Sequence, residues 1–235
     1  KLGLNRNTER TCINFMGCYA GINALKSAWH ICRSQPDAVV LLCGVELCTL
    51  HYREFETQDQ LIANALFADG AAVVVVSSKE MKTDKVQLSL NSFYSEFEPA
   101  GNDDMVWRVT EFGFDLRLSN YVPDLIKENI KALIDKLFVK SGLTKNEIDY
   151  YAIHPGGVKI LEACELALGI EKKENLNAYE VLRDYGNMSS VTIFFVLMKY
   201  LQSMNESDNG KNILSCAFGP GLTVESMILT VEKEF

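Results

Sequence analysis

The sequence predicts an α/β fold that is built in layers. Apolar residues recur at helical spacing from Ile22 to Cys32, with Leu25 and Trp29 between them. The run at residues 38–45 is continuously apolar and rich in β-branched residues, which is typical of a strand covered on both faces. A helix that is followed by a buried strand indicates alternating layers of helices and sheets.

The first part of the chain continues with polar sequence and further strands. Residues 52–65 indicate a loop or short helix over the surface, and Asp69-Gly70 has turn composition. The next predicted segments are a buried strand (71–76), a half-exposed strand (86–94), a loop (96–105) and a strand pair (106–118). The charged stretch before residue 85 marks a boundary, so we expect two domains, 1–84 and 85–235.

The second part opens with the clearest helix. Val122-Pro123 begins an amphipathic pattern that runs to about Lys140, and Gly142 ends it. The remaining predicted elements are a buried strand (148–153), a helix (158–168) closed by Gly169, a helix (191–201) and two strands (212–218 and 223–231) joined by Gly219-Pro220-Gly221.

Composition narrows the function classes. With 235 residues, 48% of them hydrophobic, the chain can bury a sizeable core. A net charge of −8 disfavours nucleic acid as a partner. No apolar run approaches the ~20 residues of a membrane span, and the first residues lack a signal-peptide pattern. We therefore expect a cytoplasmic protein without a membrane span.

The cysteines and histidines do not form a metal pattern. The seven cysteines are odd in number and lack CxxC pairs, which indicates reduced thiols rather than disulfides or structural zinc. His30, His51 and His154 show neither HxxxH nor HExxH spacing. We expect no metal site.

Cys18 is the first candidate for chemistry, because it lies between Gly17 and Gly21 at the start of an apolar helix. The helix macrodipole and free backbone N–H groups at such a position favour the thiolate, so we expect a lowered pKa. The alternative is a buried cysteine that behaves as a small hydrophobic residue.

His154 and Asn187 also stand at glycine-flanked ends of apolar segments. Alone, His154 is also consistent with a turn residue that satisfies a buried carbonyl, and Asn187 with a helix N-cap. Together with Cys18 they form a set suited to acyl transfer, in which a thiol attacks and imidazole and amide donors stabilise an oxyanion.

Five sequence runs carry a family resemblance. GCYAG, ALFADGAA, AIHPGG, DYGNMSS and FGPGLTVES occur in that order between about Gly3 and about Val231. The chain resembles the chalcone synthase or type III polyketide synthase family of the thiolase superfamily. The resemblance implies a layered α-β-α-β-α thiolase-like fold, with a nucleophile in the first half and the histidine and asparagine in the second.

The resemblance also implies roles for these residues. Cys18 would carry the acyl starter as a thioester after reaction with acyl-CoA, and would rest as a thiolate paired with a His154 imidazolium. His154 and Asn187 would stabilise the enolate that malonyl-CoA forms on decarboxylation. Such enzymes use coenzyme A thioesters as substrates without a separate cofactor, and we expect a homodimer.

Other positions match the family's substrate cavity. Phe67 matches an aromatic gatekeeper, and Phe114 matches a second one, with Phe112 as the competing position. We also expect substrate contacts from Gly156 and Gly157 of the HPGG run, from Ser189 of GNMSS, and from Phe218, at the turn that shapes the cyclisation cavity.

Several departures bear on substrate and completeness. Cys48 and His51 occupy positions where plant chalcone synthases have cavity threonines, which argues against a phenylpropanoid starter; His51 is alternatively a core histidine. Lys159 either touches coenzyme A or is a solvated helix-face lysine. Family members carry a substantial region before the nucleophile, so we expect an incomplete first half here, from a longer protein or a true truncation. A ketoacyl synthase that initiates fatty-acid synthesis and an inactive thiolase-fold fragment are the alternatives.

Overall fold

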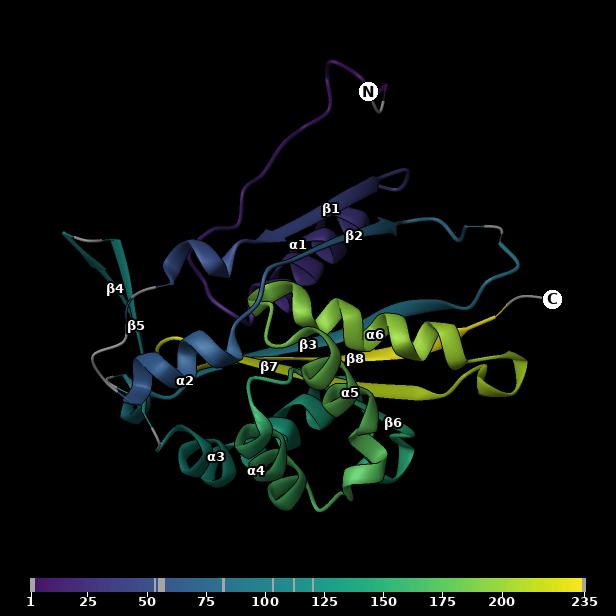
Figure 1. Ribbon diagram of the computed structural model, residues 1–235. Helices are drawn as coiled ribbons and strands as arrows, with labels where there is room; N and C mark the ends of the chain where they lie inside the picture. Colours follow the sequence, from purple (N-terminus) through teal and green to yellow (C-terminus); the bar gives the residue numbers. More distant parts are fainter. Residues whose placement is uncertain are drawn as a thin grey trace.

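The computed structural model describes residues 3–52, 54, 58–81, 83–102, 104–111, 113–119 and 121–233, with side chains described for all of these except 58–59 and 113–118. Its helices and strands alternate in layers (Figure 1). The outermost layer is an antiparallel pair, β1 (Val39–Glu46) and β2 (Gly70–Ser77). Helices α1 (Ala20–Ser34) and α6 (Thr192–Ser203) lie beneath it. This arrangement confirms the expected α/β layering.

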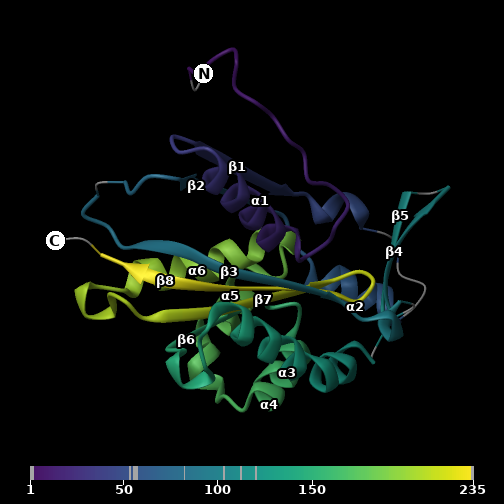
Figure 2. The ribbon, with the colours of Figure 1, turned by 180° about the vertical axis from the view of Figure 1, so that it is seen from behind.

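A four-stranded sheet forms the next layer, with the order β3-β8-β7-β6. Its strands are β3 (Gln87–Phe97), β8 (Thr223–Glu232), β7 (Asn212–Gly219) and β6 (Tyr150–Ile153). β6 and β7 are parallel, whereas β8 is antiparallel to both of its neighbours. Helices α3 (Val122–Ser141) and α4 (Val158–Leu168) cover the far face (Figure 2). Both faces of this sheet are therefore covered, and most of the core lies here.

Two of the remaining elements, a helix and a hairpin, lie at one end of the layers (Figure 1), and a further helix packs against α4, α6 and β6. These are α2 (Gln58–Leu66), the hairpin of β4 (Met105–Thr110) with β5 (Gly113–Leu118), and α5 (Leu176–Tyr185) against α6. A 3₁₀ turn spans Cys48–His51, and another spans Ser189–Val191. None of the helices within the described ranges is long and apolar enough to cross a membrane.

Local sequence explains the best-predicted helices. α3 buries a stripe that includes Ile126, Ile130 and Leu137, at the spacing of one helix face. Gly142 ends it in the left-handed conformation, and its N–H donates to the Phe138 carbonyl at 2.9 Å. α3 and α4 thus confirm the predicted helices, α4 at the predicted residues. α5 was missed because it buries only a narrow stripe, Ala178 and Val181.

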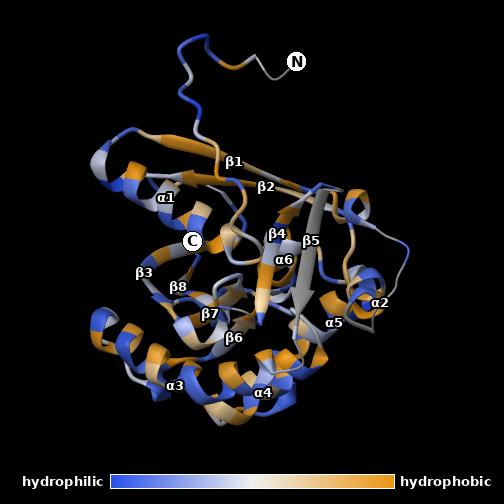
Figure 3. Ribbon diagram, turned by 90° about the vertical axis from the view of Figure 1, so that its left-hand side faces the viewer, coloured by the Kyte–Doolittle hydropathy of each residue, from blue (hydrophilic) through white to orange (hydrophobic). Residues whose placement is uncertain are grey.

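The expectation that residues 38–45 are covered on both faces is wrong. Exposure alternates along β1, and Val39 and Val45 are each 66% exposed. Val73 on β2 is likewise 66% exposed. Apolar colour runs along both strands in Figure 3, yet α1 and α6 cover the inner face and no described helix lies on the outer one (Figures 1 and 3). Among the described residues the layers run β-α-β-α, and no described helix forms the layer expected outside β1 and β2.

The predicted division at residue 84 stays a prediction. Residue 84 lies in the connection between β2 and β3, but α1 contacts β8 of the second sheet as well as β1 of the first. The two halves therefore share a helical layer.

Val73 and Val74 are neighbours on β2 that test the one-sided burial. Val74 packs against the core, whereas Val73 faces outward. We expect Val74→Ala to lower the free energy of unfolding by about 1–2 kcal/mol, because it deletes buried methyl groups. Val73→Ala should change it by less than about 0.5 kcal/mol. Urea unfolding at a concentration where size-exclusion chromatography shows a monomer measures both values, and equal losses in the monomer would contradict the one-sided burial.

Candidate active site

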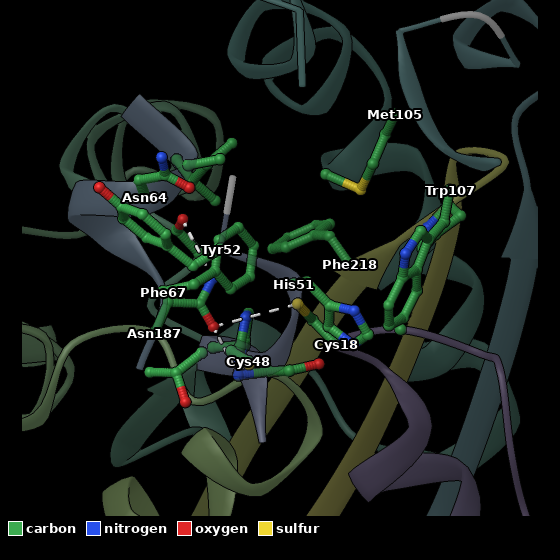
Figure 4. A pocket seen from close by; sticks show the side chains of 18 residues that line it. Cys18, Cys48, His51, Tyr52, Asn64, Phe67, Met105, Trp107, Asn187 and Phe218 are labelled. Atoms are coloured by element: carbon green, nitrogen blue, oxygen red, sulfur yellow. Dashed lines mark hydrogen bonds between the residues drawn. The ribbon is translucent and has the colours of Figure 1, made fainter. Parts of the chain in front are cut away.

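A cavity opens where the glycine-flanked runs of the sequence converge (Figure 4). It is enclosed mostly by apolar side chains, and Cys18, His154 and Asn187 all reach it. The complete lining is Gly17, Cys18, Cys48, Thr49, His51, Tyr52, Ala63, Asn64, Phe67, Met105, Trp107, His154, Gly156, Ile160, Asn187, Ser189, Phe218 and Pro220. The structure thus brings the three predicted catalytic side chains to one site.

Cys18 is placed by a tight contact between two glycine-containing turns. Gly17 has a φ of +76°, and a Cβ there would lie 2.5 Å from Cδ of Pro220. The N–H of Ala20 donates to the Gly17 carbonyl at 3.0 Å, and α1 begins at Ala20. Cys18 therefore lies two residues before the helix rather than at its first position. Glycine is required at residue 17 because the Pro220 ring occupies the space of a side chain.

His154 extends from the carboxyl end of β6. Its N–H donates to the Cys216 carbonyl at 2.8 Å, which continues the β6–β7 pairing. The side chain is 1% exposed, and neither Nδ1 nor Nε2 has a hydrogen-bond partner within the part of the chain that the structure describes. Burial lowers the pKa of His154 to about 3, because the charged imidazolium loses its hydration. The imidazole is therefore neutral, with one donor and one acceptor available.

Asn187 is fixed through both its backbone and its amide. Its N–H donates to the Leu66 carbonyl and its carbonyl accepts from the N–H of Ala68, both at 2.9 Å. Its Oδ1 accepts from the N–H of Ser189 at 2.9 Å and from Oγ1 of Thr192 at 3.4 Å. The Cys18 thiol lies 4.0 Å from the same Oδ1. The donor side of the amide faces the Gly156 carbonyl, with an Nδ2–O distance of 3.4 Å.

The lowered pKa expected for Cys18 is not found. Burial raises the pKa of the thiol to about 11, and the charge of Glu46 adds to the shift, while hydrogen bonds with the side chains of Ser189 and Asn187 partly oppose it. The dipole of α1 does not lower this pKa, because α1 begins two residues after Cys18 and the loss of hydration has the larger effect on the thiol. Among the described contacts no hydrogen bond joins Cys18 to His154, so the thiolate–imidazolium pair is not formed in this structure.

The predicted cavity residues divide into three groups. Phe67, Cys48, His51, Gly156, Ser189 and Phe218 line the cavity. Gly157 and Lys159 do not; Gly157 precedes α4, and Lys159 is exposed on it. The Phe114 backbone pairs with Val109 in the β4–β5 hairpin, but its side chain, like all of Phe112, lies outside the described residues.

Sequence reasoning missed the wall that β4 contributes. Met105 and Trp107 line the cavity, together with Tyr52 and Asn64 from the segment around α2 (Figure 4). Alternation along residues 106–118 predicted the hairpin, but no local signal shows which cavity a hairpin covers. Among the described residues, no group of three or more His, Cys, Asp or Glu side chains is arranged to hold a metal ion.

Comparison with family models decides the relationship. A model described as "Chalcone and stilbene synthases, C-terminal domain" matches residues 89–232, and the corresponding N-terminal domain model matches residues 1–80. The chain belongs to the chalcone and stilbene synthase family. This confirms the resemblance drawn from the sequence motifs and, with it, the thiolase-like fold.

Individual members of the chalcone and stilbene synthase family resemble the chain over nearly its whole length. "Probable polyketide synthase 1" of Dictyostelium discoideum is 34% identical over 97% of this chain and 7% of its own. "Alpha-pyrone synthesis polyketide synthase-like Pks18" of Mycobacterium tuberculosis is 31% identical, over 98% of this chain and 59% of its own.

A solved structure agrees with this relationship. The C-terminal type III polyketide synthase domain of Steely1, a type I/III hybrid from Dictyostelium, superposes with a TM-score of 0.90 at 31% identity. The superposition covers 97% of this chain and 64% of that one. The chain therefore spans about three fifths of the bacterial relative and of this solved domain, and less than a tenth of the Dictyostelium polyketide synthase.

Gly17 and Gly142 form a matched pair for testing the turn before the nucleophile. Both have a φ of +76°, but a Cβ at Gly142 would meet no atom within 4 Å. We expect each alanine variant to lose about 1 kcal/mol of unfolding free energy, with a further loss for Gly17→Ala from the clash with Pro220. Gly17→Ala alone should change the rate at which iodoacetamide alkylates Cys18, measured by peptide mass spectrometry. Identical alkylation in both variants would contradict the packing of Pro220 on Gly17.

The raised pKa of Cys18 predicts a pH profile. Because the thiolate is the reactive form, alkylation of Cys18 should accelerate about tenfold per pH unit from pH 6 upward and level off near the pKa of about 11. Stopped-time alkylation with peptide mapping gives the rate at each pH, and circular dichroism shows whether the fold persists. A rate that is already flat between pH 6 and 9 would instead indicate a resting thiolate paired with His154.

Proposed function

We propose that the protein is a type III polyketide synthase-like acyltransferase, which extends an acyl-CoA starter with malonyl-CoA through a thioester on Cys18. One observation carries the proposal: the buried His154 imidazole has two nitrogen atoms without partners in the described structure, in a cavity shared with a thiol and an oriented amide. A buried polar group without a partner costs free energy, so such a group is kept where a ligand satisfies it. An acyl oxygen or enolate oxygen is a suitable acceptor for its N–H.

In the first step the Cys18 sulfur attacks the thioester carbonyl of acyl-CoA. The neutral His154 accepts the thiol proton as the S–C bond forms, and this proton leaves with coenzyme A when the old C–S bond breaks. A neutral imidazole suits this role, since it has an acceptor nitrogen that an imidazolium lacks. The step needs no metal or further cofactor.

In the second step malonyl-CoA loses carbon dioxide and leaves an enolate. Donors from His154 and from Nδ2 of Asn187 stabilise the enolate oxygen, and the enolate carbon attacks the acyl group on Cys18. The bond between the acyl carbon and the Cys18 sulfur breaks, the released thiolate takes up a proton from solvent, and the product is a β-ketoacyl-CoA two carbons longer. Repetition of both steps gives a polyketide chain, for which Phe67, Cys48, His51 and Phe218 supply cavity walls.

The proposal includes a homodimer in the cytoplasm. The apolar outer face of β1 and β2, where Val39, Val45 and Val73 are each 66% exposed, supports an assembled form in which this face is covered. We retain Phe114 and Lys159 as substrate contacts under the proposal. Fatty-acid initiation on an acyl carrier protein and an inactive module are the competing outcomes of the experiment below.

The test separates thioester formation from decarboxylation. We expect intact-protein mass spectrometry after incubation with acyl-CoA to show an acyl adduct in the wild type and in Cys12→Ala, which changes an exposed cysteine, but not in Cys18→Ala. Cys18→Ala should still release carbon dioxide from malonyl-CoA, because the oxyanion donors remain, while Asn187→Ala should slow this release about 10²-fold.

The opposite results are equally informative. A wild-type protein that forms no adduct with any acyl-CoA and releases no carbon dioxide would support an inactive module. Condensation with malonyl-acyl carrier protein but not with malonyl-CoA would favour fatty-acid initiation. Loss of decarboxylation in a folded Cys18→Ala variant would contradict the separate roles assigned to the thiol and the donors.

A further inference from the structure

A buried ion pair joins the helix that follows Cys18 to the central sheet. Nζ of Lys26, on α1, donates to the two carboxylate oxygens of Glu225, on β8, at 2.8 and 2.7 Å. Ser95 lies opposite Glu225 in the pairing of β3 with β8. Its hydroxyl accepts from the same Nζ at 2.6 Å and donates to Oε2 of Glu225 at 2.7 Å. The three side chains therefore tie α1 to two neighbouring strands of the four-stranded sheet.

The Glu225 carboxylate is almost fully enclosed. Its side chain is 4% exposed, against 22% for that of Lys26. Taking both charges out of water costs free energy that their mutual attraction often fails to offset, and well-packed apolar residues in such a place are frequently as stable. Stability alone is therefore a weak reason for this pair. Its other effect is geometric, because the bonds to both carboxylate oxygens fix where α1 lies along β8.

The turn before α1 is attached to the same pair of strands. A Cβ at Gly17 would lie 2.5 Å from Cδ of Pro220, and a Cβ at Gly219 would lie 2.4 Å from the Tyr19 ring. Residues 17–19 thus lie directly on the turn that joins β7 to β8. Together with the ion pair of Lys26, these contacts hold the whole segment from residue 17 to residue 26 along the β7–β8 hairpin.

The position of the Cys18 thiol depends on these attachments. Its Sγ lies 4.0 Å from Oδ1 of Asn187. Asn187 is fixed separately, by backbone hydrogen bonds with Leu66 and Ala68. A slip of α1 along the sheet by even part of its 5.4 Å pitch would therefore move the thiol relative to the amide.

We propose that Lys26 and Glu225 are positioning residues for Cys18: their ion pair fixes the register of α1 on β8 and thereby holds the thiol in the cavity beside Asn187. Neither Lys26 nor Glu225 lines the cavity, so both act through α1. The positioning stands on the geometry of the pair, whereas its consequence for acyl transfer rests on the proposed function.

Two reactions of the Cys18 sulfur test the proposal. Iodoacetamide alkylates the sulfur with loss of iodide, and acyl-CoA transfers its acyl group to the sulfur with loss of coenzyme A. The test protein is the double variant Lys26→Met with Glu225→Met, which leaves no buried charge unpaired. Because a thiol released from its place gains hydration and forms thiolate more easily, we expect alkylation at neutral pH to be about tenfold faster than in the wild type. Acyl transfer should be about tenfold slower, because it needs the thiol in one geometry.

A second thiol and two further variants separate positioning from a loss of stability. Cys164, on α4, is 0% exposed, and peptide mapping of the same samples should show its alkylation unchanged. Lys26→Arg keeps a cation that can bond both oxygens of Glu225, and should return both Cys18 reactions to within about threefold of the wild-type rates. Glu225→Gln keeps the shape of the side chain but removes its charge, and should change both rates in the same directions as the double variant.

Lys199 and Glu180 form a matched control pair. Their ion pair is 2.7 Å long and joins α6 to α5, and the Lys199 side chain is 24% exposed. The double variant Lys199→Met with Glu180→Met removes a comparable ion pair without touching α1. It should leave both reactions of Cys18 at their wild-type rates.

Two results would overturn the proposal. One is a wild-type alkylation rate at Cys18 in the folded Lys26→Met and Glu225→Met double variant or, if that protein does not fold, in Glu225→Gln. The other is an equal acceleration at Cys18 and Cys164, which would assign the effect to general unfolding. A wild-type protein that forms no acyl adduct would defeat the proposed function, and the alkylation rates would still decide whether the ion pair positions Cys18.

Discussion

Two backbone hydrogen bonds between the end of α2 and Asn187 join the parts of the site that come from distant segments. Asn187 exchanges them with Leu66 and Ala68, which makes Phe67 and Asn187 partners in a parallel bridge. α2 leads into β2 and Asn187 leads into α6, so the bridge locks the outer sheet to the central helical layer. Each such bond contributes about 1 kcal/mol net to stability. The two bonds set Phe67 and Asn187 at a fixed separation.

Burial governs the chemistry of the site more than any local dipole does. Loss of hydration holds Cys18 as a thiol and His154 as a neutral imidazole. Glu46, the last residue of β1, accepts hydrogen bonds from the N–H and the hydroxyl of Ser190, which ties β1 to the turn before α6. The same carboxylate raises the pKa of the Cys18 thiol. The fold thus gains a rigid turn beside Asn187 and a less acidic thiol at Cys18. Under the proposed function, proton transfer to His154 accompanies the attack of the sulfur rather than preceding it.

The helices and strands that were predicted correctly are those whose own residues contain both the apolar pattern and the residues that end it. α3 and α4 have an apolar stripe and a terminal glycine, and β7 with β8 has a turn between two apolar runs. Residues 38–45 are apolar throughout, a pattern that does not distinguish a strand covered on both faces from one covered on one face. Trp107 was missed for a different reason: the hairpin was evident, but its contact with Phe15 joins residues 92 positions apart. Cys18, His154 and Asn187 were predicted as site residues because glycines flank them and because the motifs resemble those of a family. The direction in which the pKa of Cys18 shifts was predicted wrongly, because it depends on burial that the sequence does not reveal.

The strained backbone at Ser189 explains why the Asn187 amide is oriented before any ligand binds. With a φ of +51°, Ser189 turns its N–H onto Oδ1 of Asn187, and the Thr192 hydroxyl holds the Ser189 carbonyl at 2.8 Å. Because Oδ1 faces the donors of Ser189, Thr192 and Cys18, the opposite amide orientation would set Nδ2 against other donors. The amide therefore presents its N–H groups on the side of Gly156, in the cavity that it shares with His154, whose imidazole has no hydrogen-bond partner among the described residues. Donors fixed in this way need no reorganisation when negative charge develops, which is the condition under which hydrogen bonds lower a reaction barrier most.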